Sequence, residues 1–188
     1  PAVTFAAYAR AVERGENIPS PILELVGLDP TPYQVLRHLV PRDQRRERGT
    51  FFTSTATATR LWSDALATIA SGSVIVDPAC GAGDLLTPAV EHIRTLELRD
   101  VTVRGYDIDA DLARVASARL RLALGAAQGL IEGLARDFLD DASCVGDATH
   151  VVLNPPFIPV AVNETWASGK TNAAAVFTVR ALESMRPG

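Results

Sequence analysis

Short runs of consecutive apolar residues alternate along the chain with longer stretches whose apolar residues recur at helical spacing. Four of these runs have the length and the β-branched content of buried strands, at residues 73–77, 101–106, 130–135 and 149–153. Amphipathic stretches predict helices between and around them, at residues 58–69, 85–96, 112–123 and 174–185. Such alternation is typical of parallel sheets with helices on both faces, so we expect an α/β fold with a doubly wound, mostly parallel sheet.

The beginning of the chain has a different pattern, without strand-like runs. It predicts two or three short helices, the first of which ends at Gly15. Ser20 and Thr31 each stand before a proline, the order expected of an N-cap followed by proline at the first helical position. We therefore divide the chain into an N-terminal helical segment, residues 1–44, and a main domain, residues 45–188.

The composition fits one sizeable core, since 47% of the 188 residues are hydrophobic and 21% are charged. The net charge of −4 argues against a surface that binds polyanions over the whole chain. Any contact with nucleic acid is then local or belongs to another part of the protein. Basic side chains gather at one place, which a solvated linker would also explain: Arg42, Arg45, Arg46 and Arg48.

No apolar window reaches the roughly 20 residues that a bilayer span needs, and no basic and then apolar signal sequence opens the chain. We expect a cytoplasmic protein without a membrane partner. Cys80 and Cys144 form neither a CxxC pair nor a disulfide framework, and the three histidines are scattered. We therefore expect no metal site.

A glycine turn follows the first predicted strand, which ends at Asp77. Pro-Ala-Cys-Gly-Ala-Gly at residues 78–83 leads into the next helix, where Pro88 fits only in the first turn. A strand, a glycine turn and a helix in this order let backbone amides approach a nucleotide-like ligand closely. The carboxylate at the strand end can also meet an ammonium group.

Acidic residues also follow the second and third predicted strands. Asp107 lies near the distance from the glycine turn at which nucleotide-binding βαβ units place their ribose-binding acid, whereas Asp109 fits the N-cap of the next helix. Asp137 and Phe138 could accept a hydrogen bond from an adenine amino group and flank its ring. A surface turn explains this last pair as well.

An aromatic segment precedes the helix that comes before the first strand. It reads Arg-Gly-Thr-Phe-Phe-Thr at residues 48–53, and Ser54 or Thr55 is the expected N-cap. Free amides at that helix end would face whatever the segment encloses, and they suit a carboxylate. Phe51 and Phe52 also fit an ordinary place in the core.

The fourth predicted strand ends in Asn-Pro-Pro-Phe at residues 154–157. Two prolines fix two φ angles and remove two backbone donors, so the turn is stiff and its carbonyls can point into a cleft. We interpret this turn as a binding site for an exocyclic amino group. After it we expect a loop over residues 158–169 and a last helix capped by Thr171. No further strand follows, so we expect a sheet that is truncated in this chain.

In combination, the glycine turn and Asn-Pro-Pro-Phe resemble the amino-methyltransferases that use S-adenosylmethionine. The aromatic segment makes the chain more similar to N6-adenine DNA methyltransferases, in the branch of type I modification subunits and fused restriction-modification enzymes. The resemblance covers about residues 45–188. It implies a Rossmann-like S-adenosylmethionine-dependent methyltransferase fold and methyl transfer to the N6 amino group of a flipped-out adenine in DNA, within a restriction-modification or phage-defence system.

The resemblance also implies roles for individual residues. Phe52 and Thr53 match the segment that holds the methionine end of the cofactor, although Ser54 stands where the family usually has proline. The other residues matched to the cofactor are Asp77, Ala79, Cys80, Gly81 and Gly83 at the methionine moiety, Asp107 at the ribose hydroxyls, and Ile108, Asp137 and Phe138 at the adenine. The residues matched to the catalytic motif, of which Asn154 also lies beside the cofactor, are Asn154, Pro155, Pro156 and Phe157.

These roles imply a direct methyl transfer without a metal. The Asn154 side-chain carbonyl and the Pro155 backbone carbonyl would hold both amino hydrogens and favour a pyramidal nitrogen, while Phe157 stacks on the extruded base. DNA would bind mainly through regions beyond residue 188, a specificity or restriction subunit could take part, and residues 1–188 alone are expected to be inactive. The open alternatives are methylation of an RNA base or a protein glutamine, and a non-catalytic S-adenosylmethionine-binding protein.

Overall fold

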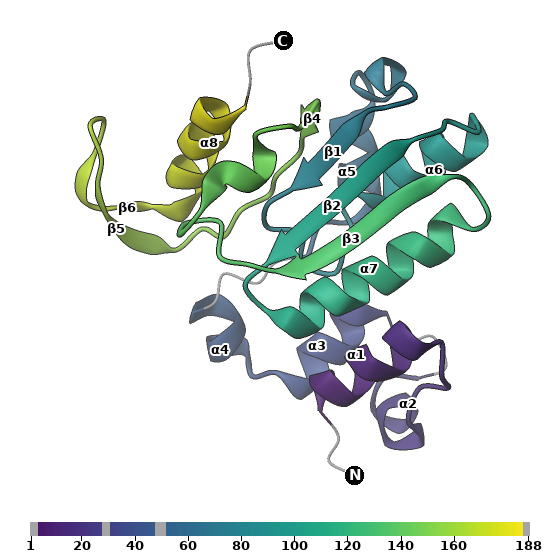
Figure 1. Cartoon of the computed structure of the whole chain (residues 1–188). Helices are drawn as coiled ribbons and strands as arrows, with labels where there is room; N and C mark the ends of the chain where they lie inside the picture. Colours follow the sequence, from purple (N-terminus) through teal and green to yellow (C-terminus); the bar gives the residue numbers. More distant parts are fainter. Residues whose placement is uncertain (1–3, 28–30, 48–51, 186–188) are drawn as a thin grey trace.

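A four-stranded parallel sheet forms the centre of the structure, a computed structural model that describes residues 4–27, 31–47 and 52–185 (Figure 1). The strands lie in the order β3-β2-β1-β4, and each neighbouring pair is parallel. Their bounds are β1 Val74–Asp77, β2 Val101–Asp107, β3 Gly129–Ala135 and β4 His150–Val151. The expected parallel sheet is confirmed, although β4 is shorter than its predicted run.

Helices surround this sheet and precede it in the chain. Their bounds are α1 Phe5–Arg14, α2 Ser20–Val26, α3 Pro32–Leu39, α4 Arg42–Glu47, α5 Thr55–Trp62, α6 Thr87–Thr95, α7 Ala110–Leu124 and α8 Ala173–Ser184. Two short 3-10 helices are η1 Leu66–Thr68 and η2 Ala142–Val145. Within the described residues, no helix is both long and apolar enough to cross a membrane.

The two faces of the sheet are covered by different helices. Ile75, Val103 and Ile131 turn to one face, where they pack with the apolar sides of α6 and α7. Val76 and Tyr106 turn to the other face and pack with η2 and α8. Successive side chains of a strand point to opposite faces, so these two sets follow directly from the strand pattern.

The N-terminal helices lie on the outer side of α7 (Figure 1). Leu112 and Val115 of α7 pack with Phe5 and Tyr8 of α1, so α7 is buried between the sheet and the N-terminal segment. Thr31 caps α3 as predicted, since its hydroxyl accepts from the backbone N–H of Gln34. At α2 the prediction is wrong, because the helix already includes Ser20, which makes no capping bond. The division of the chain after residue 44 stays a prediction.

One predicted helix is shorter than its apolar stripe. Residues 58–69 were expected to form a single helix, but α5 ends at Trp62 and the chain continues through a turn into η1. The indole N–H of Trp62 donates to the backbone carbonyl of Leu85 over 2.7 Å, which anchors the helix end against the start of α6. The apolar pattern continues beyond α5 because the 3-10 turn of η1 still places Ile69 in the core. Ser54 is the N-cap, one of the two residues expected there.

The predicted loop after the Asn-Pro-Pro-Phe turn is instead a β-hairpin. Its antiparallel strands are β5 Pro159–Asn163 and β6 Ser168–Asn172. The hairpin extends beside α8, away from the central sheet (Figure 1). The residues of β6, Ser-Gly-Lys-Thr-Asn, have little intrinsic strand preference. The loop prediction failed because pairing with β5 outweighs this local propensity. Asn172 caps α8 by accepting from Ala174 N–H, whereas Thr171 was predicted to do so.

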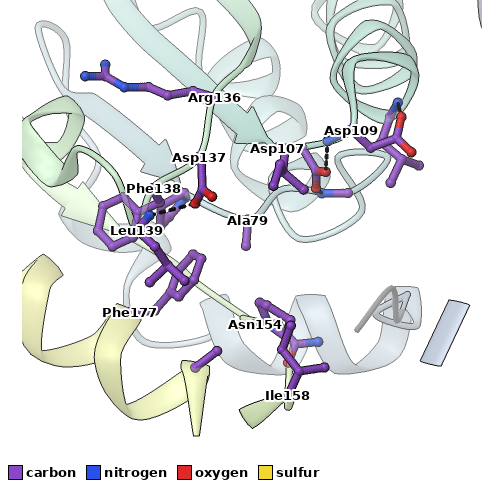
Figure 2. Close-up of a pocket in the computed structure, with 16 residues that line it drawn as sticks. Ala79, Asp107, Asp109, Arg136, Asp137, Phe138, Leu139, Asn154, Ile158 and Phe177 are labelled. Atoms are coloured by element: carbon purple, nitrogen blue, oxygen red, sulfur yellow. Dashed lines mark hydrogen bonds between the residues drawn. The ribbon is translucent and has the colours of Figure 1, made fainter. Parts of the chain in front are cut away.

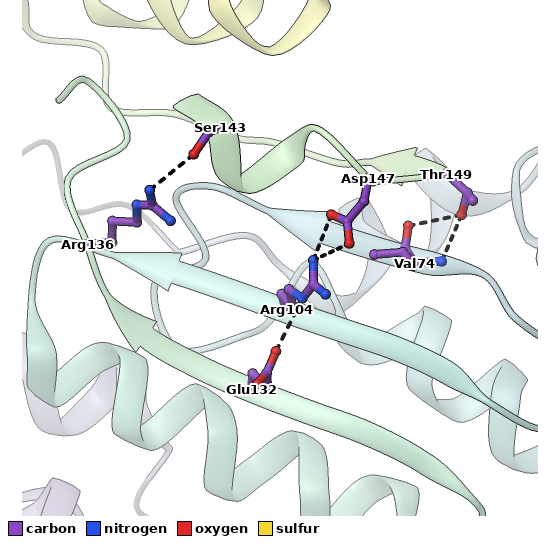
Figure 3. Close-up of polar contacts among 7 residues, drawn as sticks. All are labelled: Val74, Arg104, Glu132, Arg136, Ser143, Asp147 and Thr149. Atoms are coloured by element: carbon purple, nitrogen blue, oxygen red, sulfur yellow. Dashed lines mark hydrogen bonds and ion pairs between the residues drawn. The ribbon is translucent and has the colours of Figure 1, made fainter. Parts of the chain in front are cut away.

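Polar side chains fix how β2, β3 and β4 sit against one another (Figure 3). Arg104 in β2 donates to Glu132 of β3 over 3.2 Å and to Asp147, before β4, over 2.7 Å. The Thr149 hydroxyl accepts from the N–H of Val74 and donates to its carbonyl, both over 2.9 Å. These bonds hold the short β4 in register with β1, which positions the turn that follows β4.

Candidate active site

Polar side chains from all four parallel strands meet at one edge of the sheet. Asp77 ends β1 and Asp107 ends β2, while Asp137 and Asn154 lie shortly after β3 and β4. Parallel strands place their carboxyl ends at the same edge, and the chain order reverses between β1 and β4. Ligands of open α/β sheets bind in the crevice at this position.

A cavity of about 330 Å³ lies at this edge, and we call it the main cavity (Figure 2). The predicted site residues that line it are Ala79, Gly81, Asp107, Ile108, Asp137, Phe138, Asn154 and Pro156. A second hollow of about 10 Å³, the small cavity, adjoins it. Its predicted lining residues are Phe52, Thr53, Asp77, Ala79, Cys80, Gly81 and Asn154. Ala79, Gly81 and Asn154 border both cavities.

Asp107 has a carboxylate that backbone amides orient. Its Oδ2 accepts from Gly81 N–H and its Oδ1 from Asp109 N–H, each over 2.9 Å. A carboxylate oxygen accepts about two hydrogen bonds, so each oxygen keeps capacity for a ligand hydroxyl. Burial raises the pKa of Asp107 to about 6, against the lowering effect of the two backbone bonds.

Asp77 is the most buried acid at the site, with 1% of its surface exposed. It accepts from Ala79 N–H over 3.0 Å, and burial raises its pKa to about 7, with the Asp107 charge as a smaller cause. An uncompensated buried carboxylate is costly, and a ligand ammonium group would offset that cost. Asp77 lines the small cavity, which is therefore suited to a cationic group.

The glycine turn borders the cavities with backbone atoms that no side chain covers. Gly81 has φ +52° and a Cβ added there would meet no atom within 4 Å. Gly83 lines neither cavity, and its added Cβ would lie 3.2 Å from Ala116 Cβ, so it serves the contact with α7. Cys80 is buried beside the small cavity, and burial raises the pKa of its thiol, which disfavours the thiolate form.

The far end of the main cavity combines an exposed and a buried apolar side chain. Ile108 is 71% exposed, which leaves its surface open to a flat ring. Phe138 is fully buried against Phe177 of α8, with ring centroids 4.9 Å apart. The Asp137 carboxylate accepts from Leu139 N–H over 2.8 Å, which fixes the turn after β3.

Asn154 is joined to the aromatic segment across 101 positions of sequence. Its Nδ2 donates to Thr53 Oγ1 over 3.0 Å. Among the described residues, its Oδ1 has no hydrogen-bond partner. Asn154 therefore presents an acceptor where the two cavities meet. Residues 48–51 of the aromatic segment lie outside the described residues.

Some predicted site residues lie beside the cavities rather than on their walls. Pro155 is buried and Phe157 is 61% exposed, and neither lines the main cavity or the small cavity. Sequence reasoning missed several wall residues of the main cavity: Leu139, Ile158, Ala173 and Phe177. Phe177 was predicted only as part of the apolar stripe of the last helix, and no local signal distinguishes it from ordinary core.

The residues at this edge fit S-adenosylmethionine. A buried acid in the small cavity matches an ammonium group, and Asp107 with spare acceptor capacity matches a hydroxyl pair. The main cavity offers Ile108 and the turn after β3 to a planar base. In the described part of the chain, no group of three or more His, Cys, Asp or Glu residues could hold a metal ion.

Solved structures share the fold. The chain is similar to a protein described as a modification subunit of a type I restriction enzyme from Vibrio vulnificus YJ016, with 20% identity and a TM-score of 0.57 over 78% of this chain and 34% of that one. The type IIG restriction endonuclease BpuSI matches with 18% identity and a TM-score of 0.56 over 99% of this chain and 30% of that one. A Listeria monocytogenes protein assigned to the class I S-adenosylmethionine-dependent methyltransferases matches with 14% identity and a TM-score of 0.50, over 97% and 62%. The fold is thus the Rossmann-like fold of S-adenosylmethionine-dependent methyltransferases, as expected.

The family follows from the sequence comparison. Residues 33–185 match the family described as N-6 DNA Methylase, and the chain belongs to this family. No curated protein sequence matches the chain. The chain spans about a third of the length of the first two structural relatives, 34% and 30%.

Proposed function

We propose that the protein containing this chain transfers a methyl group from S-adenosylmethionine to the N6 amino group of a flipped-out adenine in DNA. Membership of the N-6 DNA methylase family supports this reaction. The likeness to a modification subunit and to a restriction endonuclease supports a setting in restriction-modification or phage defence, with DNA and a specificity or restriction subunit as partners.

The bond between Asn154 Nδ2 and Thr53 Oγ1 is the observation that carries the proposal. Because the amide nitrogen is engaged, the amide plane is set and its carbonyl oxygen is left to accept from a substrate. An exocyclic amino group has two hydrogens to donate, and the Pro155 carbonyl is the second acceptor in our proposal. Two fixed acceptors favour a pyramidal nitrogen whose lone pair is directed away from the ring.

The cofactor would lie across both cavities. Asp77 would pair with its ammonium group, Asp107 would accept from its ribose hydroxyls, and Ile108 with the Asp137 turn would contact its adenine. When bound, S-adenosylmethionine supplies a methyl group on a positively charged sulfur. Gly81 leaves space for this ligand, because its added Cβ meets open space.

The substrate base would reach the site from the exposed side of the Asn-Pro-Pro-Phe turn. Phe157 is 61% exposed there, so its ring is available to stack on an extruded base. Stacking of a base on an aromatic ring stabilises by about 1–3 kcal/mol. An extruded base is required because N6 of adenine is enclosed in a duplex.

Substitution of Asn154 tests the proposal. Asn154→Ala in the full-length protein should lower kcat for methyl transfer by about 10²–10³-fold, because an oriented acceptor is lost. The dissociation constant for S-adenosylmethionine, measured by calorimetry, should change by less than about threefold. Loss of both methyl transfer and S-adenosylmethionine binding would point to a structural role for Asn154. Unchanged methyl transfer would refute the proposal.

Thr53 offers a matched control. Thr53→Val removes the partner of Asn154 Nδ2 but keeps the shape of the side chain, so kcat should fall. Thr53→Ser keeps the hydroxyl and should retain most of the activity. A Thr53→Val protein with full kcat would show that the bond does not orient Asn154.

A further inference from the structure

Helix α8 forms part of the wall of the main cavity and also contacts the turn after β3 through two side chains one helical turn apart. Phe177 packs on Phe138, and Arg180 Nη1 donates to the backbone carbonyl of Leu139. Leu139 lines the main cavity, whereas Arg180 does not. The backbone N–H of Leu139 donates to the Asp137 carboxylate, so both the N–H and the carbonyl of Leu139 have a fixed partner.

The same guanidinium also binds the hairpin that follows the Asn-Pro-Pro-Phe turn. Arg180 Nη2 donates to Glu164 Oε1 over 2.6 Å, in the segment between β5 and β6. The side chains of Arg180 and Glu164 are 27% and 31% exposed, so water screens this pair only in part. Arg180 therefore links the segment between β5 and β6 to Leu139 of the cavity wall.

We propose that Arg180 is a positioning residue that sets the Leu139 turn for the cofactor, and that Glu164 on the hairpin holds Arg180 in place. The ligand named here rests on the proposed function. The position of the hairpin and the affinity for S-adenosylmethionine are then coupled, because both depend on one guanidinium. Phe138 is buried against Phe177 independently of Arg180, so we expect loss of Arg180 to shift the wall without unfolding the protein.

Four variants of the full-length protein test this inference. Arg180→Met keeps the apolar stem and loses every donor, Arg180→Lys keeps one charged group, and Glu164→Gln keeps a polar group but loses the charge. Arg121→Met is the matched control, since Arg121 in α7 donates to the backbone carbonyl of Ile131 from Nε and Nη2, over 3.4 and 3.1 Å, and lines neither the main nor the small cavity. The readouts are the Kd and KM for S-adenosylmethionine, kcat, and the melting temperature.

Arg180→Met should raise the Kd and KM for S-adenosylmethionine about tenfold and leave kcat within about twofold. Arg180→Lys and Glu164→Gln should raise them by smaller factors, and Arg121→Met should leave them unchanged. An Arg180→Met protein with wild-type Kd would overturn the inference, as would an equal rise in Kd in Arg121→Met. Wild-type protein that binds no S-adenosylmethionine would overturn the proposed function and this inference with it, whereas an unchanged Arg180→Met beside a binding wild type overturns this inference alone.

Discussion

Asp77 and Asp107 end neighbouring strands, and burial raises the pKa of their carboxyl groups to about 7 and about 6. A raised pKa in the folded state means that the folded protein holds these protons more tightly than the unfolded chain. The contribution of each acid to the free energy of unfolding is therefore complete below the ordinary pKa of 3.8, and it is lost as pH rises through about 6 for Asp107 and about 7 for Asp77. At neutral pH the two carboxylates therefore lower the free energy of unfolding, but in their charged form they can bind a ligand.

The affinity for S-adenosylmethionine should consequently rise with pH between about 5.5 and 7.5. Asp77 must lose its proton to pair with the ammonium group, so binding at pH 6 should release a proton. Above about pH 8 the affinity should fall again, because an α-amino group loses its own proton there. Calorimetry in two buffers of different ionisation enthalpy measures the proton release.

Asp77→Asn provides the control for this pH dependence. The variant should bind weakly, and the part of the proton release that belongs to Asp77 should disappear. An affinity that does not change between pH 5.5 and 7.5 would show that the buried acid does not meet a cationic group.

Site residues beside strong local signals could be predicted from the sequence. Asp77, Asp107 and Asn154 each follow an apolar run and precede glycine, an N-cap or proline, and the structure brings all three to one edge. Arg180 and Leu139 carry no such signal, because their positions depend on how α8 packs against the turn after β3.

At the scale of elements, α7 owes its position to close contacts with β3. A Cβ added at Gly133 would lie 2.3 Å from the carbonyl oxygen of Ala113 and 2.7 Å from Ser117 Cβ. These atoms belong to the interior of α7 and cannot move aside singly. At this position the backbone of β3 can approach α7 this closely because residue 133 has no side chain.

Gly133→Ala should lower the free energy of unfolding by about 3 kcal/mol, since overpacking forces β3 and α7 apart. Gly72→Ala is the control: its Cβ would meet nothing within 4 Å, but its φ of +85° is costly for alanine, by about 1 kcal/mol. Urea denaturation at one pH compares the two. Equal losses would contradict the close approach of α7 to β3.

The sequence predicted the elements that have regular periodicity and failed where tertiary contacts decide. Strands β1 to β3 and helices α1, α3, α6 and α7 lie where their patterns placed them. The end of α5 at Trp62 depends on a bond to Leu85, and the β5–β6 hairpin depends on cross-strand pairing of a polar segment. Neither partner is visible in the local pattern.

At the scale of the whole molecule, two helical layers enclose the sheet and leave its carboxyl edge open. The N-terminal helices add a further layer behind α7, and the hairpin and α8 flank the edge (Figure 1). The net charge of −4 gives this chain little general attraction for DNA. In our proposal, this chain supplies the cofactor site and the Asn-Pro-Pro-Phe turn.

The nature of the methylated product tests the central claim most directly. The full-length protein and its partner subunits are expressed in a host without adenine methylation, and the host DNA is digested and analysed by mass spectrometry. We predict N6-methyladenine in the DNA with the wild-type protein and far less of it with Asn154→Ala. Methylation confined to cytosine, RNA or protein glutamine, or no methylation by a protein that binds S-adenosylmethionine, would contradict the claim.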